Sequence, residues 1–288
     1  MADGLLARAK VNLYLHVTGR RADGYHTLDS LFVRTGLGDR LVLDTAQADS
    51  LALTGPFAGA LAGEPPGRNL AMRAVAAVRK RCGRGGPVAL SLEKNIPVAA
   101  GLGGGSADAA AALLAADALF DAGLDAATLA GLAAGLGADV AACLHESPLA
   151  VSGIGERLSA LAGIPPFALL LVNPGMALST ADVFAARAGA FSPAMPMTAP
   201  EDFEGLVGAL DERGNDLQQA ALGLVPEIGD VLRELAGLSG ARLVRMSGSG
   251  ATCFALFADL AAAQAGQAAL ERDRPAWWVR ATTVAGTR

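Results

Sequence analysis

The sequence predicts a protein of two domains that contain both helices and strands. The chain has 288 residues, which is enough for two modest domains with apolar cores. Segments with the twofold alternation of strands are mixed with segments of helical period along its whole length. The pattern restarts around Pro165 and Pro166. We therefore expect a boundary near residue 155, with domains at 1–155 and 156–288.

Strands are expected early in the first domain. Apolar residues alternate from Val11 to Val17, so the odd positions should face a core. Lys10 and Asn12 then share the opposite face, roughly 6–7 Å apart along the strand. Further strands are predicted at 30–34, 40–44, 88–92 and 149–151.

Helices should follow these strands in the first domain. Residues 55–67 are rich in Gly and Pro and predict a loop, and Asn69 stands at the start of a helix that reaches about Arg81. An Ala-rich helix is expected from Ala107 to Phe120, with Ser106 as its N-cap. Another is expected over 126–136, followed by a turn at 137–140.

The second domain shows the same mixture. Predicted strands lie at 167–172, 242–246, 253–257 and 277–281. Predicted helices lie at 180–187, 203–210, 227–238 and 260–271.

Composition argues against several functional classes. The formal net charge is −5 and no basic tract occurs, so nucleic acid is not an expected partner. No long apolar run or signal peptide is evident, which predicts no membrane partner and a cytoplasmic location. The three cysteines and three histidines have no metal-site or disulfide spacing.

A glycine-rich segment connects a predicted strand to a predicted helix. It reads Pro97-Val98-Ala99-Ala100-Gly101-Leu102-Gly103-Gly104-Gly105-Ser106-Ala107. Glycines let an anion approach the backbone, and a helix start supplies unpaired N–H donors, so the segment predicts a phosphate site. A purely structural turn is the alternative.

Two well-known phosphate loops fit this segment poorly. The Walker loop requires a Lys that is missing here. The dinucleotide fingerprint requires a third Gly where Ser106 stands, although Asp121 or Asp125 could supply its later acidic residue.

The segment instead resembles the second motif of the GHMP kinases. Two other segments agree with this resemblance. Residues 9–13, followed by 19–26, are similar to an N-terminal signature of the family, and 246–252 looks like its third motif. All three occur in the family order.

The resemblance implies an α+β fold with the two GHMP kinase domains. The N-terminal domain would resemble domain 2 of ribosomal protein S5, and the C-terminal domain would be ferredoxin-like. The implied activity is transfer of the γ-phosphoryl group of ATP to a hydroxyl of a small-molecule substrate by a monomer or homodimer. Mg²⁺ would be held mainly through ATP. The triple glycine resembles the branch whose acceptor carries a cytidine diphosphate.

The resemblance also implies roles for residues. Lys10 and Asp139 match the catalytic pair, although the family often has Pro where Ala141 stands. The ATP-binding positions are residues 97–107 together with Asn69 and Lys94. The substrate positions are Asn12, Tyr25, His26 and Phe184, of which Tyr25 and Phe184 would enclose a cytosine ring. No protein ligand is assigned to a metal; for Asp108, interaction with the helix dipole is preferred over binding of magnesium.

Three other functions are compatible with parts of the pattern. Another GHMP kinase would act on a sugar, homoserine or mevalonate, and the Tyr25-His26 segment argues against it. A dinucleotide-binding oxidoreductase would use the glycine-rich segment for NAD. A non-catalytic module would bind ATP without turnover, which agrees poorly with the presence of both Lys10 and Asp139.

Overall fold

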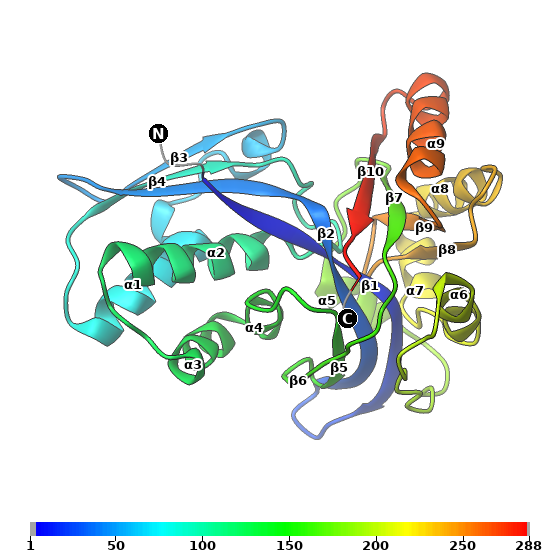
Figure 1. The fold of residues 1–288 in the computed structure, drawn as a ribbon, viewed down its shortest axis with the longest axis horizontal. Helices are drawn as coiled ribbons and strands as arrows, with labels where there is room; N and C mark the ends of the chain where they lie inside the picture. Colours follow the sequence, from blue (N-terminus) through cyan, green and yellow to red (C-terminus); the bar gives the residue numbers. More distant parts are fainter. Residues whose placement is uncertain (1–3, 287–288) are drawn as a thin grey trace. The chain divides into compact units, whose positions relative to one another are not determined.

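The computed structural model describes residues 4–286, which divide into two compact units (Figure 1). Each unit is built from three separate segments. The first unit contains residues 4–9, Leu37–Val98 and Gly103–Glu146. The second contains Lys10–Gly36, Ala99–Leu102 and the residues from Ser147 onward. The division at residue 155 remains a prediction about domains, since the compact units alternate along the chain.

The sheet of the first unit is formed around β4 (Val88–Glu93). β3 (Ser50–Thr54) pairs with it in parallel, and residues 40–45 of β2 (His26–Thr45) pair with it in antiparallel fashion. β1 (Leu5–Arg20) begins in this unit and pairs with β2. The helices of this unit are η1 (Ala58–Leu61), η2 (Pro66–Arg68), α1 (Leu70–Cys82), α2 (Gly104–Leu119), α3 (Ala126–Leu136) and α4 (Ala138–Ala142).

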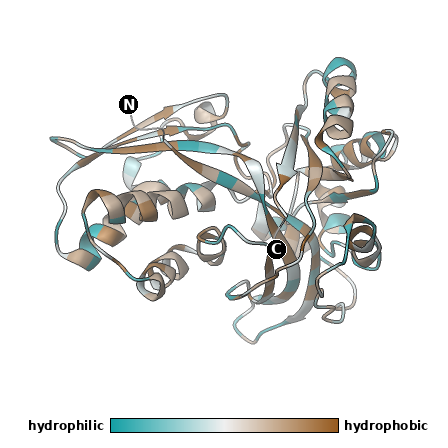
Figure 2. Ribbon diagram, viewed as in Figure 1, coloured by the Kyte–Doolittle hydropathy of each residue, from teal (hydrophilic) through white to brown (hydrophobic). Residues whose placement is uncertain are grey.

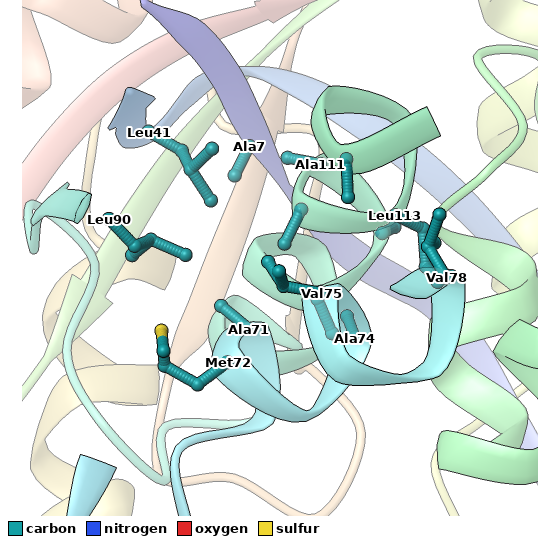
Figure 3. Close-up of a cluster of buried hydrophobic side chains, with 14 of the residues drawn as sticks. Ala7, Leu41, Ala71, Met72, Ala74, Val75, Val78, Leu90, Ala111 and Leu113 are labelled. Carbon is teal, nitrogen blue, oxygen red and sulfur yellow. The ribbon is translucent and has the colours of Figure 1, made fainter. Parts of the chain in front are cut away.

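Small side chains allow the helices of the first unit to approach closely. Figure 3 shows Val75 and Val78 of α1 beside Ala111 and Leu113 of α2, with Leu41 of β2 near them. All five side chains are buried. The repeated alanines of α2 leave room for α1, so this Ala-rich helix serves as a packing surface beneath the strands.

The second unit contains a four-stranded antiparallel sheet. Its strands are β7 (Phe167–Asn173), β8 (Leu243–Met246), β9 (Cys253–Phe257) and β10 (Trp278–Val284). Their spatial order β10-β7-β9-β8 is the order fourth, first, third and second in the chain, which is that of a ferredoxin-like sheet. Figure 2 shows hydrophobic residues along these strands, and every residue of β7 is buried.

Helices and two further strands complete the second unit. Residues 28–32 of β2 pair with β5 (Leu149–Gly153), which pairs with β6 (Arg157–Ala160). The helices are α5 (Thr180–Ala186), α6 (Phe203–Asp211), α7 (Gln218–Leu224), α8 (Glu227–Ala236) and α9 (Leu260–Asp273).

Three expectations about local structure were wrong, and several elements were not predicted. The strands predicted at 30–34 and 40–44 are one strand, β2, which pairs with β1, β4 and β5 and is not interrupted by Gly36 and Gly38. Ser106 is not an N-cap, since the left-handed Gly103 occupies that position and α2 begins at Gly104. The turn at 137–140 contains the start of α4. The strands β3 and β6 and helix α7 were not predicted.

Within residues 4–286, no helix is both long and apolar enough to cross a membrane.

Candidate active site

The glycine-rich loop has a backbone conformation that its glycines permit. Ala99, Gly101 and Gly103 all have positive φ, at 53°, 75° and 63°. This region favours glycine because an L side chain meets the backbone there. The left-handed residues alternate with Ala100 and Leu102, so the loop turns tightly before α2. A turn at this place agrees with the predicted strand before the loop and the predicted helix after it.

The first part of the loop is held by hydrogen bonds within the second unit. The backbone N–H of Lys10 donates to the Leu102 carbonyl at 3.0 Å, and that of Thr252 donates to Ala100 at 3.2 Å. The Ser247 hydroxyl donates to the Gly101 carbonyl at 3.0 Å. Three successive carbonyl oxygens are therefore turned toward protein donors. This orientation suits a phosphate loop, since carbonyl oxygens repel an anion.

We expect Gly101→Ala to weaken MgATP binding by about tenfold or more and to lower the melting temperature, because a left-handed alanine is strained by roughly 1–2 kcal/mol. A Cβ there would also lie 2.4 Å from the Ser247 carbonyl oxygen and 2.9 Å from that of Gly250. Calorimetry with MgATP and thermal unfolding would measure both effects. The control is Gly131→Ala in α3, where nothing lies within 4 Å of the added carbon. Unchanged affinity in Gly101→Ala would contradict the expectation.

The second part of the loop runs into the start of α2 in the first unit. Gly103 is the N-cap, and Gly104, Gly105 and Ser106 form the first helical turn. The helix is 16 residues long, so its first N–H groups present a partial positive charge. Asn69, also expected in the nucleotide site, caps α1 by accepting a hydrogen bond from Ala71 at 3.0 Å.

Lys10 and Asn12 lie on one face of β1, as the alternation predicted. The Lys10 ammonium donates to Asn12 Oδ1 at 2.7 Å and lies 4.4 Å from the centre of the Phe32 ring. The Asn12 amide nitrogen donates to Ser30 Oγ at 2.8 Å, and its backbone N–H donates to Ser247 Oγ at 3.1 Å. Both side chains are buried, so the ammonium is held in a defined position.

Asp139 lies in the first turn of α4, two residues after the N-cap Gly137, whose φ is 157°. Its side chain is half-buried. The resemblance to the GHMP kinases singled out this residue, which stands in the Gly-Ala-Asp segment, and no periodic pattern did.

Aromatic side chains gather at the start of β2. The His26 and Phe184 rings are stacked, with centroids 5.1 Å apart, and Phe191 meets His26 edge-on at 6.4 Å. Tyr25 is 63% exposed and Phe191 is 48% exposed. Partial burial, together with Arg20 and Arg187, lowers the pKa of His26, which favours a neutral imidazole at pH 7. Sequence reasoning missed Phe191, because it follows α5 in a segment without periodicity.

Lys94 is buried between two carboxylates of the first unit. Its ammonium contacts Asp39, and it lies 2.6 Å from Asp108 Oδ2. Asp39 Oδ1 also accepts hydrogen bonds from the backbone N–H groups of Asn95 and Ile96 at 2.5 and 2.9 Å. Asp108 therefore forms an ion pair with Lys94, whereas the sequence favoured an interaction with the helix dipole over binding of magnesium. Asp39 was not singled out, since nothing local in its surroundings indicates a distant lysine.

The pKa of Asp108 is raised to about 7. Burial is the main cause, Lys94 opposes it and Asp39 adds to it. One ammonium facing two carboxylates leaves excess negative charge, so a proton on Asp108 relieves it. The unfolded state loses this proton near pH 4, whereas the folded state keeps it to about pH 7.

Wild-type stability should therefore fall as pH rises through this window, by at most about 1.4 kcal/mol per pH unit for one proton. Asp108→Asn removes the titrating group, so the variant should gain stability relative to wild type as pH rises from about pH 4 to about pH 7. Urea unfolding at several pH values measures the difference. Parallel stability curves for the two proteins would contradict the expectation.

Comparison with known proteins agrees with this arrangement of motifs. Residues 69–147 match the GHMP kinases N terminal domain, and residues 201–275 match the GHMP kinases C terminal domain. A protein of Paracoccus denitrificans named 4-diphosphocytidyl-2-C-methyl-D-erythritol kinase is 48% identical over 97% of this chain and 96% of its own length. The chain belongs to the GHMP kinase family. A Rhodospirillum rubrum protein of the same name is 48% identical over 99% of this chain and 94% of its own.

Solved structures of GHMP kinases share the fold. A crystal structure of 4-(cytidine 5'-diphospho)-2C-methyl-D-erythritol kinase matches with a TM-score of 0.81 and 38% identity, over 98% of this chain and 99% of that one. A homoserine kinase from Cytophaga hutchinsonii matches with a TM-score of 0.68 and 16% identity over 96% and 95%, which is evidence for the fold alone. The predicted two-domain GHMP kinase fold is confirmed.

Proposed function

We propose that this GHMP kinase transfers the γ-phosphoryl group of ATP to the 2-hydroxyl of 4-diphosphocytidyl-2-C-methyl-D-erythritol. The products are the 2-phosphate and ADP, within the non-mevalonate route to isoprenoids. The observation that carries the proposal is the identity of 46–48% along nearly the whole chain to relatives that bear this kinase's name. Kinases of homoserine and mevalonate are similar only at the level of the fold.

The aromatic cluster supports a pyrimidine nucleotide as the acceptor. The family resemblance implies Tyr25, His26 and Phe184 as substrate positions. The stacking of His26 on Phe184 supports this assignment, and Phe191 adds a further exposed ring beside His26. Planar rings stack on a cytosine base, and a neutral imidazole can both donate and accept a hydrogen bond at its polar edge. Arg20 and Arg187 act electrostatically on His26 and would favour the nearby diphosphate of such a substrate.

We assign ATP to the glycine-rich loop, residues 97–107, with Asn69 in the same nucleotide site. Lys94, which the family resemblance also places near the nucleotide, has its ammonium buried between Asp39 and Asp108. The tethered carbonyls and the start of α2 support this assignment. When bound, Mg²⁺ would neutralise phosphate charge, held mainly by ATP oxygens and water.

Lys10 and Asp139 are the proposed catalytic residues. The acceptor hydroxyl loses its proton as it attacks the γ-phosphorus, and a carboxylate can take or orient that proton. An ammonium stabilises the negative charge of the transferring group. Asn12 would orient the acceptor beside Lys10. A cytoplasmic monomer or homodimer remains the expected form of the enzyme.

The test is ADP release by the purified protein with MgATP and each acceptor in turn. Galactose, homoserine and mevalonate are compared with the diphosphocytidyl compound. Of these four acceptors, we expect only the diphosphocytidyl compound to support ADP release. Turnover with another acceptor would refute the substrate assignment. Hydride transfer without ATP would refute the assignment of kinase activity.

A further inference from the structure

The buried charges of the first unit lie on both sides of the glycine-rich loop. Lys94 follows β4 and stands three residues before Pro97, where the loop begins. Asp108 is the fifth residue of α2, in which the loop ends. Their ion pair at 2.6 Å therefore connects the segment before the loop to the helix after it.

Asp39 gives this connection a fixed anchor in the sheet. It lies in β2 and is 0% exposed. One of its oxygens contacts the Lys94 ammonium, and the other accepts the backbone N–H groups of Asn95 and Ile96. Three donors from consecutive residues thus converge on one carboxylate, so the direction in which the chain enters the loop depends on Asp39.

The cluster is a poor device for stability alone. Two carboxylates and one ammonium are all nearly inaccessible to water, and desolvation of such charges often exceeds their attraction. Among the described residues, no hydrogen-bond partner contacts Oδ1 of Asp108, although this atom is buried. An apolar cluster of similar volume would fill the space without this desolvation penalty. We therefore infer that the charges serve to orient the backbone that they contact.

The location of the Lys94 ammonium also argues against a direct contact with nucleotide. The side chain is 3% exposed and is engaged by both carboxylates. A phosphate or an adenine ring would have to displace one of these buried partners to reach it. Its influence on ATP would therefore act through Asp39, which accepts the backbone N–H groups of Asn95 and Ile96 next to the loop.

We propose that Asp39, Lys94 and Asp108 form a charge clamp that positions the two ends of the glycine-rich loop for MgATP. Asp39 and Lys94 are positioning residues in this scheme, and neither touches the nucleotide. The proposal rests on the assignment of ATP to the loop, but not on the identity of the acceptor.

The experiment measures MgATP affinity by calorimetry without acceptor, together with thermal unfolding, for the full-length chain. Asp39→Asn keeps the shape of the side chain but removes its charge. We expect its MgATP dissociation constant to rise by about tenfold, since the loop entry loses its charged acceptor. With the diphosphocytidyl acceptor present, KM for ATP should rise in parallel, whereas kcat and KM for the acceptor should stay within about twofold.

The matched control is Asp49→Asn in the same unit. Like Asp39, Asp49 combines an ion pair with a backbone hydrogen bond. It lies 2.8 Å from the Arg79 guanidinium and accepts the Val88 N–H at 2.8 Å. It contacts no loop residue through these bonds. Its loss should lower the melting temperature without changing MgATP affinity. A merely structural role for Asp39 predicts that both variants behave alike, and that result would overturn the clamp.

A second pair of variants, at Asp108, tests the proposal even if Asp39→Asn does not fold. Asp108→Ala removes a costly buried charge and should fold, but it cuts the connection to α2, so MgATP affinity should fall by about three- to tenfold. Asp108→Asn retains an acceptor for Lys94 and should restore affinity to within about twofold of wild type. Wild-type affinity in Asp108→Ala would overturn the proposal. Failure of wild type itself to bind MgATP would instead refute the ATP assignment.

Discussion

Asp139→Asn is expected to lower kcat by about a thousandfold or more, while the fold and the affinity for MgATP persist. The substitution preserves the size of the side chain but leaves an amide that cannot take a proton. Since the acceptor hydroxyl must lose its proton as the new P–O bond forms, the chemical step should suffer and binding should not. Steady-state kinetics and MgATP calorimetry separate the two.

A matched control exists in the same unit. Asp125 caps α3 through the backbone N–H of Thr128 at 2.8 Å, and Asn caps a helix about as well as Asp does. Asp125→Asn should therefore leave kcat unchanged. If Asp139→Asn retained more than about a tenth of wild-type kcat with the diphosphocytidyl acceptor, Asp139 would not be the group that handles the proton.

Lys10→Met is expected to reduce kcat by about 10²–10³-fold, because it removes a cation that is already oriented before the reaction. The ammonium is held by Asn12 and lies over the Phe32 ring, so it needs little reorganisation to stabilise charge on the phosphoryl group. Methionine keeps the length and apolar character of the buried stem. The folded state should persist, which circular dichroism can verify.

Two further variants sharpen this expectation. Lys10→Arg should not restore activity, since a planar guanidinium cannot replace a compact ammonium in the space above Phe32. Lys80→Met, on the exposed face of α1, serves as the control for loss of a lysine and should leave kcat unchanged. Near-normal turnover in Lys10→Met would mean that Lys10 contributes only to packing of β1.

Local periodicity predicted many elements and part of the candidate site. The alternation from Val11 to Val17 placed Lys10 and Asn12 on one face, and the 2.7 Å hydrogen bond between them confirms it. Asn69 was expected at a helix start and is the N-cap of α1. Such features depend on the backbone geometry of a single element, which residues a few positions apart determine.

Predictions failed where a neighbouring strand decided the structure. Gly36 and Gly38 lie inside β2 and do not end it. A Cβ at Gly38 would lie 2.4 Å from the Ala7 carbonyl oxygen, so glycine is needed there for β1 to approach. Within the loop, Gly103 and not Ser106 is the N-cap of α2, because the turn before the helix requires a left-handed residue there.

By itself, the sequence determined the family, the alternating mixture of strands and helices, and the residues expected to carry out phosphoryl transfer. These properties reside in short motifs and in periodic patterns along single elements. Only the tertiary structure brought Asp39 to Lys94, 55 residues away, set Ser247 against Gly101 and placed Phe191 beside His26. Each of these contacts joins segments distant in the chain, and their pairing depends on how sheets and helices pack together rather than on any local preference of the residues involved.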